Sequence, residues 1–177
     1  MKSTIRVIPY GLGLINPEEN QKIREWSSEE FGDLAICKAF EYQAGSDYCV
    51  LVYDDENLVG FGAIFRREIR FDMKTLFMGG VGGIIIAPSH RKMGYGTMIM
   101  KEVHRIIFSA LKCDLGCLLC LRETIEFYKE LGWRTSDAKV LVDRAGEKVP
   151  WPEFFMYHPK DDKDIQVKEI DLCGFPW

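Results

Sequence analysis

The segment "KTLFMGGVGGIIIAPSHRKMGYGTMIM", residues 74–100, constrains the fold more than any other part of this sequence. Its first half is an apolar run that two pairs of glycines interrupt and that ends before Pro88. Such a run is typical of a strand, and glycines inside a strand indicate a bulge or the close approach of another group. Apolar residues then recur at helical spacing from Ile99 to Ala110. The segment therefore predicts a strand, a glycine-containing loop and an amphipathic helix.

The loop "HRKMGYG" brings positive charge and bare backbone together at the start of this helix. The first N–H groups of a helix have no partner within the helix, and with the helix dipole they favour an anion. Gly94 and Gly96 leave the backbone accessible, and Arg91 and Lys92 add charge. A phosphate group fits such a loop. Taken alone, "GYG" is better explained by glycines that are needed only for packing, because short glycine patterns are common. Neither of the common nucleotide-binding glycine patterns is present.

The remaining pattern predicts one α/β domain, residues 1–177, around a mixed sheet. "NPEENQKIREW" is typical of a helix start capped by Asn16, and "YCVLVYDDENLVGFGAIFRREIRF" indicates two strands joined by a turn at residues 54–57. "LGCLLC" indicates a short buried strand, and "RETIEFYKELGW" a second amphipathic helix capped by Gly132. Late strands are expected in "KVLV", "FFMY" and "IQVKEI", so that helices come first and strands last.

The composition excludes several classes of protein. The chain has 177 residues, of which 47% are hydrophobic, and this is enough for a sizeable core. A net charge of -4 without a long basic run disfavours nucleic-acid binding, and no apolar run reaches the length that a membrane span needs. The N-terminal segment does not fit a signal peptide, so we expect reduced cysteines and a cytoplasmic location. Cys117 and Cys120 of "CLLC" should point to opposite faces of a strand, which favours core packing and no metal.

Two linked motifs resemble those of the GNAT N-acetyltransferases. "IIIAPSHRKMGYGTMIM" is similar to the acetyl-coenzyme A (acetyl-CoA) signature of that family, and "TIEFYKELGW" resembles its later helix with Phe-Tyr and a Leu-Gly-aromatic ending. The resemblance implies a splayed mixed sheet flanked by helices, with acetyl-CoA as donor between two strands. It implies that strand backbone holds the pantetheine arm and that loop amides hold the pyrophosphate. These positions are Ile84, Ile85 and Ile86 in the strand and Arg91, Lys92, Met93, Gly94, Tyr95, Gly96 and Thr97 in the loop.

A closer resemblance, from about Asp55 to Trp133 and at the last residue, is to the aminoglycoside 2′-N-acetyltransferases. It implies a small cationic acceptor, with the 2′-amine of an aminoglycoside as a candidate. Three positions depart from that subfamily. Gly82 stands where it has a glutamate that acts on the amine through water, Leu119 where it has a serine, and Phe175 where it has an aspartate. These departures concern the acceptor and the base, and they leave the cofactor motifs intact.

The resemblance assigns Tyr128 as the acid that protonates the leaving thiolate. A tyrosine is protonated at neutral pH and can donate, although its place on the apolar helix face also fits simple core packing. The general base stays open, and a water relay or backbone carbonyls are preferred to His90, His104 or His158. A strand N–H near Ile84 is expected to stabilise the oxyanion.

The acceptor side is expected to carry carboxylates and aromatic rings. Carboxylates at Glu41, Asp47 and Glu153 would attract an amine, and solvated surface charge explains each of them equally well. Trp151 is suited to stacking on a sugar or to packing. The resemblance implies that Trp177 folds back into the acceptor site and turns its terminal carboxylate toward the amine.

The sequence therefore predicts an acetyl-CoA-dependent N-acetyltransferase that acts on a primary amine of a small acceptor. Two alternatives remain open: a peptide or protein N-terminus as acceptor, and an acyl-CoA-binding module that has lost turnover. The predicted partner is the amine acceptor, and assembly into a homodimer is compatible with the sequence.

Overall fold

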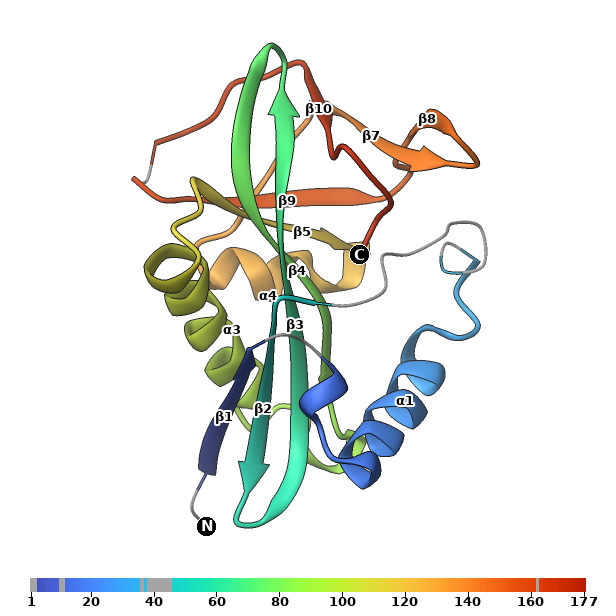
Figure 1. The fold of residues 1–177 in the computed structure, drawn as a ribbon, viewed down its shortest axis with the longest axis vertical. Coiled ribbons are helices and arrows are strands. Elements are labelled where there is room, and N and C mark those ends of the chain that lie inside the picture. The colour runs from blue at the N-terminus through green and yellow to red at the C-terminus, as the bar shows by residue number, and fades with distance from the viewer. Residues whose placement is uncertain (1–2, 10–11, 36, 38–45, 162) are drawn as a thin grey trace.

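One mixed sheet of ten strands organises the protein (Figure 1). The computed structural model describes residues 3–9, 12–35, 37, 46–161 and 163–177. The main path of the sheet runs β6-β9-β5-β4-β3-β10-β7-β8, and β2 joins β1 to β3. Two neighbouring pairs are parallel, β4 with β5 and β10 with β7, and the others are antiparallel. The strands are β1 (Ser3–Pro9), β2 (Tyr48–Asp54), β3 (Asn57–Phe71), β4 (Lys74–Ile86), β5 (Leu115–Cys120), β6 (Arg134–Thr135), β7 (Lys139–Arg144), β8 (Glu147–Pro150), β9 (Phe154–Pro159) and β10 (Glu169–Asp171).

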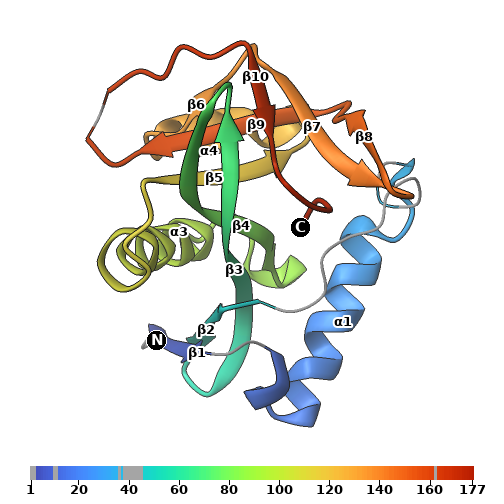
Figure 2. The same ribbon diagram turned by 45° about the horizontal axis from the view of Figure 1, so that its top comes forward.

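Helices cover both faces of this sheet (Figures 1 and 2). One buried cluster joins α1 to the C-terminal segment and the late strands, and a second joins α3 and α4 to the opposite face. The described helices are α1 (Pro17–Phe31), α3 (Tyr95–Arg105), which continues into a π-helical turn (η3, Ile106–Ala110), and α4 (Ile125–Glu130). Three short 3₁₀ turns accompany them: η1 (Leu12–Leu14), η2 (Pro88–His90) and η4 (Arg122–Thr124).

The structure confirms the main predicted elements. Asn16 caps α1, because its side chain accepts a hydrogen bond from the N–H of Glu19 at 2.9 Å. The turn at residues 54–57 joins β2 to β3, and Ile99, Val103 and Ile106 are fully buried. Cys117 belongs to the cluster on the α1 face and Cys120 borders the opposite cluster, as expected for residues three apart in a strand.

Three expectations from the sequence were wrong. The strand β1 precedes the first helix, so the chain does not begin with helices. The segment "IQVKEI" is strand only at its end, in β10, because residues 165–168 form no ladder. The helix after β5 is shorter than its amphipathic pattern, since η4 occupies its first turn and Gly132 ends it with a φ of 85°.

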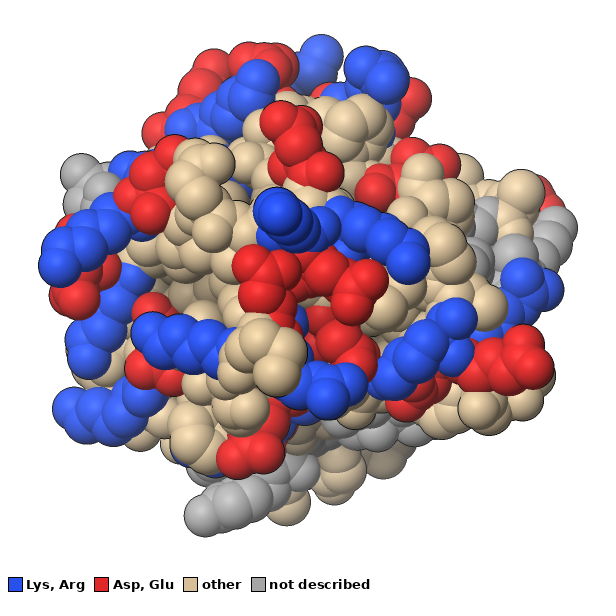
Figure 3. Space-filling model, turned by 90° about the horizontal axis from the view of Figure 1, so that it is seen from above, with Lys and Arg blue, Asp and Glu red and all other residues tan. Residues whose placement is uncertain are grey.

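Asp171 of β10 is a buried carboxylate that joins the late strands to β3. It pairs with Arg70 of β3 and with Lys148 of β8 (2.7 Å), and it accepts a hydrogen bond from the N–H of Cys173 at 2.8 Å. Lys148 also contacts Asp143 at 2.6 Å. Figure 3 looks down on this end of the molecule and shows acidic and basic side chains interleaved. Burial alone would raise the pKa of Asp171, but the hydrogen bonds from Lys148, Arg70 and Cys173 lower it to about 2.

This network predicts a loss of stability in acid. The folded pKa of Asp171 lies below its usual value of 3.8, so its contribution is present above about pH 4 and is lost as the pH falls toward 2. Asp171→Asn should lower the free energy of unfolding by about 2 kcal/mol at pH 7, because two charged hydrogen bonds are weakened. Denaturant unfolding at pH 7 and pH 3 checks this. The difference in the free energy of unfolding between Asp171→Asn and the native chain should shrink at pH 3. Glu56→Gln, in the exposed β2–β3 turn, serves as control. If the two chains differed in the free energy of unfolding by the same amount at both pH values, the predicted role of Asp171 would be contradicted.

Candidate functional site

The two central parallel strands separate halfway along β4. Their pairing runs from Met78 with Leu115 to Val81 with Leu118 and goes no further, although both strands continue. Beyond this point β4 pairs only with β3, and β5 only with β9, among the described strands. A gap in the sheet therefore opens at Val81, and one backbone edge of residues 82–86 has no strand beside it.

A bulge lies at the mouth of this gap. Phe61 of β3 pairs with Ile85, whereas Ala63 pairs with Gly82, so two residues of β4, Gly83 and Ile84, stand opposite one residue of β3. Gly83 has a φ of 59°, a conformation that favours glycine. The bulge that the glycines predicted is therefore present, and it turns the backbone near Ile84 out of the ladder.

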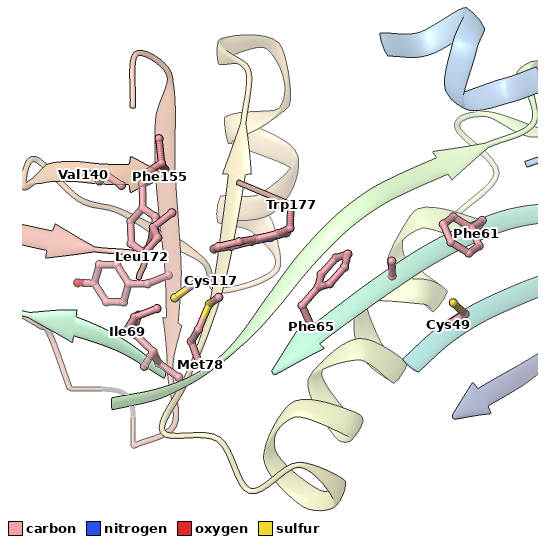
Figure 4. Close-up of a cluster of buried hydrophobic side chains, with 14 of the residues drawn as sticks. Cys49, Phe61, Phe65, Ile69, Met78, Cys117, Val140, Phe155, Leu172 and Trp177 are labelled. Carbon is pink, nitrogen blue, oxygen red and sulfur yellow. The ribbon is translucent and has the colours of Figure 1, made fainter. Parts of the chain in front are cut away.

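The close approach that the glycines also predicted comes from Trp177. A Cβ atom at Gly80 would lie 2.8 Å from the indole, and one at Gly82 would lie 3.0 Å from it. The indole Nε1 donates a hydrogen bond to the carbonyl of Val81 at 3.0 Å, and the ring lies beside Phe65 (Figure 4). Trp177 is 9% exposed. Its ring thus covers β4 at the point where the strands part, on the face that α1 also covers.

The backbone of the C-terminal segment is tied down before it reaches this position. Arg67 of β3 donates to the carbonyls of Leu172 (3.1 Å) and Phe175 (2.8 Å), and its guanidinium lies over the indole of Trp177. The N–H of Asp143 donates to the carbonyl of Gly174 at 2.9 Å. These bonds hold the indole against β4, so the C-terminal segment folds back toward the gap.

A cavity of about 900 Å³ runs through the gap and has walls from both faces of the sheet. Tyr128 and Thr124 line it on the α4 side, and Trp177 and Phe31 line it on the α1 side. Between them lies the bulged part of β4, including Ile84. Two molecules that enter from opposite faces can therefore meet at the gap.

Tyr128 lies in an apolar environment with a thiol beside it. Burial, and secondly the neighbouring Cys120, raise the pKa of Tyr128, so that its hydroxyl stays protonated at neutral pH. Burial also raises the pKa of Cys120 to about 11; a hydrogen bond with Thr124 opposes this, and the charge of Glu153 adds to it. A thiolate at this place therefore takes up a proton readily.

The start of α3 has the features of an anion site. Gly94 caps the helix with a φ of 87°, no side chain caps it, and a Cβ there would meet no atom within 4 Å. The N–H groups of Tyr95, Gly96 and Thr97 begin the helix and are available to an anion. The side chain of Tyr95 is buried, so this residue offers only its backbone. Gly96 has a second reason to be glycine, since a Cβ there would lie 3.2 Å from Phe127.

Arg91 links this loop to the cavity. Its guanidinium donates to Glu30 of α1 at 2.6 Å and, more weakly, to the carbonyl of Ile86 at 3.3 Å. Glu30 lines the cavity, so the loop, the end of β4 and α1 are connected through one side chain. Lys92 and Met93 are exposed beside it.

The predicted acceptor residues divide into three groups. Trp151, Glu153 and Trp177 line the cavity. Asp47 does not: its carboxylate accepts a hydrogen bond from the N–H of Arg66, which ties it to β3 instead. Glu41 lies outside the described residues.

Sequence reasoning missed the contribution of α1 to the cavity. Arg24, Ser27, Glu30 and Phe31 all face it, and so does Glu123 of η4. The sequence predicted only that a helix starts after Asn16, because no motif marks which face of it would border a gap in a distant sheet. Glu123 directly precedes the motif "TIEFYKELGW". Nothing else in the sequence indicated that this residue lines the cavity.

Neither a metal site nor a membrane-spanning helix is found among the described residues. Within residues 3–9, 12–35, 37, 46–161 and 163–177, no group of three or more His, Cys, Asp or Glu side chains is placed to hold a metal ion. None of the helices described above is long and apolar enough to cross a membrane.

Residues 15–133 match the Acetyltransferase (GNAT) family. Among solved structures, the GNAT-family N-acetyltransferase YhbS from Escherichia coli, in complex with CoA, has a TM-score of 0.63 at 14% identity, over 96% of this chain and 89% of that one. Escherichia coli ElaA has a TM-score of 0.58 at 14% identity, over 88% of this chain and 99% of that one. A GCN5-related N-acetyltransferase from Kribbella flavida has a TM-score of 0.54 at 16% identity, over 75% of this chain; the chain spans only 34% of its length.

The anion site predicts a specific effect of Gly94→Ala. Gly146, in the β7–β8 turn, is its matched control: both have left-handed φ values (87° and 84°), and a Cβ at either meets nothing within 4 Å. Each alanine should cost about 1–2 kcal/mol of stability from backbone strain. Only Gly94→Ala should weaken CoA binding, by about tenfold or more, because it crowds an amide cradle for a charged group. Calorimetric titration with CoA measures this, and equal affinity in the two folded variants would contradict the anion site.

Proposed function

The chain belongs to the GNAT family of acetyltransferases, and from this premise we propose that it transfers an acetyl group from acetyl-CoA to a primary amine of a small cationic acceptor. One observation carries the proposal. The cavity passes through the gap between β4 and β5, with Tyr128 on one face and Trp177 on the other. Such a passage allows a thioester and an amine to approach one another from opposite faces of the sheet.

The residues of the donor side fit acetyl-CoA. The open backbone at Gly94 and the free amides of the first turn of α3 suit a pyrophosphate. The free edge of residues 82–86 can pair with the amide groups of a pantetheine arm, as an added strand would. Ile84, in the bulge, offers backbone at the point where the thioester carbonyl would lie, and its N–H is suited to a developing oxyanion.

In the proposed reaction the amine nitrogen attacks the thioester carbonyl, a C–N bond forms and the C–S bond breaks. Tyr128 supports the second event by donating its proton toward the leaving sulfur. The raised pKa of its hydroxyl makes it a weak acid, but the same burial makes the leaving thiolate more basic, as the pKa of about 11 for Cys120 beside it indicates. Burial therefore raises the pKa of this proton donor and that of a thiol beside it in the same direction.

The proton that the amine loses needs a different route. Gly82 has no side chain, and His90, His104 and His158 are not among the residues that line the cavity. The carboxylates of Glu123 and Glu153 do line it, and the charge of Glu153 acts on Cys120 beside Tyr128. We assign these two carboxylates to attracting the protonated amine and to receiving its proton through water.

The sequence resemblance implies an aminoglycoside 2′-amine as a finer candidate for the acceptor. Two of the three positions that depart from that subfamily, Gly82 and Leu119, line the cavity. Trp177 covers the space at Gly82 that a longer side chain would need. The aminoglycoside stays a prediction that the assay below tests beside simpler amines.

Thiol release separates the proposed enzyme from an acyl-CoA-binding module. The protein is incubated with acetyl-CoA and a panel of small amines, an aminoglycoside and a short peptide, and free thiol is followed with a disulfide reagent. We expect release that depends on a small amine. Tight binding of acetyl-CoA with no release above the protein-free rate for any amine would favour the module, and release with the peptide alone would favour a peptide acceptor.

The assigned acid predicts the effect of Tyr128→Phe. The substitution keeps the ring and its packing against Trp133 but removes the hydroxyl. We expect the rate at saturating acetyl-CoA to fall between about tenfold and ten-thousandfold, as for other general acids, with CoA affinity unchanged. Tyr157→Phe is the matched control, because its hydroxyl bonds Asp164 away from the cavity. Full activity of Tyr128→Phe would show that the hydroxyl is dispensable.

A further inference from the structure

Resting on the proposed function, we infer that the acceptor is a primary amine carried on an aromatic or similarly apolar body, and that a polyhydroxylated amine is disfavoured. Large apolar side chains that remain partly exposed form much of the cavity wall. They come from three separate parts of the chain: the end of α1, the end of β5 and the segment between β8 and β9. The residues are Phe31, Leu34, Leu119, Leu121 and Trp151.

Trp177 adds an apolar face to the same wall. Its one donor, the indole N–H, is already used on the carbonyl of Val81 at 3.0 Å. A ligand that lies flat on this ring therefore meets carbon, and the main-chain carbonyl group of Trp177 lies at its edge, with its carbon 3.3 Å from a Cβ built on Gly82. Gly82, next to it, offers backbone alone.

The polar side chains of the cavity come from α1, from η4 and α4 with Thr124 and Tyr128, and from the segment before β9. Arg24, Ser27 and Ser28 belong to α1, where Glu30 is occupied by Arg91 at 2.6 Å. Glu123 and Glu153 lie on the other side, with η4 and the segment before β9. An aminosugar carries a hydroxyl on most ring carbons, and each one pressed against an apolar wall loses its bonds to water without replacement. The wall therefore penalises a sugar and favours a body without hydroxyls.

The carboxylates place the amine end of the acceptor. Glu153 is close enough to Cys120 for its charge to act on that thiol, and Cys120 in turn acts on Tyr128. A protonated amine attracted to Glu153 thus lies at the Tyr128 end of the cavity, where the thioester would be. The body of the acceptor then extends along Leu119 and Trp177 toward Phe31. Charge at one end and aromatic walls along the rest match an arylalkylamine.

The test compares three monoamines, each of which carries one positive charge when protonated: 2-phenylethylamine, butylamine and glucosamine, with kanamycin as the aminoglycoside. Calorimetric titration of each into the protein saturated with CoA measures binding without any need for turnover. We expect 2-phenylethylamine to bind at least about tenfold more tightly than glucosamine, because only its ring gains from burial. Butylamine should lie between them. Equal or tighter binding of glucosamine or kanamycin would overturn the inference.

Leu119→Ser sharpens the test, because it places a hydroxyl in the middle of the apolar wall. We expect about a three- to tenfold loss of 2-phenylethylamine affinity, unchanged CoA affinity, and a smaller preference over glucosamine. Leu14→Ser is the control, since Leu14 is 63% exposed and does not line the cavity. An unchanged preference in folded Leu119→Ser would contradict the assigned wall.

Binding of the amine and release of thiol are separate measurements, so the acceptor inference and the transferase proposal can each fail alone. An aromatic amine that binds as expected but releases no thiol from acetyl-CoA would refute the transferase and leave this inference standing. Thiol release that is faster with glucosamine or kanamycin than with 2-phenylethylamine would support the transferase and refute the inference.

Discussion

The end of the β4–β5 pairing at Val81 and Leu118 is the constraint on which the rest of the site depends. Two parallel strands that part leave unpaired backbone groups inside the protein, and these need partners. Trp177 supplies one, because its indole N–H bonds the carbonyl of Val81. The ring can reach that carbonyl only because Gly80 and Gly82 have no side chains in its way. The remaining free edge of β4 is available to a ligand.

The two faces of the sheet beside this gap carry different kinds of residue. The face with α3 and α4 holds the anion site and Tyr128, which suit a phosphate-bearing thioester. The face with α1 and Trp177 forms an apolar wall, and Glu123 and Glu153 lie on the other side of the cavity. The ion pair between Arg91 and Glu30 joins the loop before α3 to α1. Because both faces open into one cavity, the site is arranged for transfer between two bound molecules.

Local patterns were reliable where local physics decides the structure. The cap at Asn16 and the β2–β3 turn follow from neighbouring residues, and the structure has both. Short pairings were not predictable: β10 has three residues, and its pairing depends on Asp171 finding Arg70 and Lys148 from distant strands. The strand β1 was missed for a similar reason, since its alternation is weak and its partner β2 lies some forty residues away.

The sequence by itself determined the strand, loop and helix of the proposed donor side. A strand, a glycine loop and a helix in direct succession can form an anion site without help from elsewhere, and a motif of adjacent residues carries it. The acceptor side was decided by the tertiary structure. Phe31, Leu119, Trp151 and Trp177 come from four distant segments, and only the course of the sheet brings them to one wall. The carboxylate of Asp47, which looked equivalent to that of Glu153 in sequence, bonds backbone on β3 because a side chain's surroundings follow from packing between remote elements.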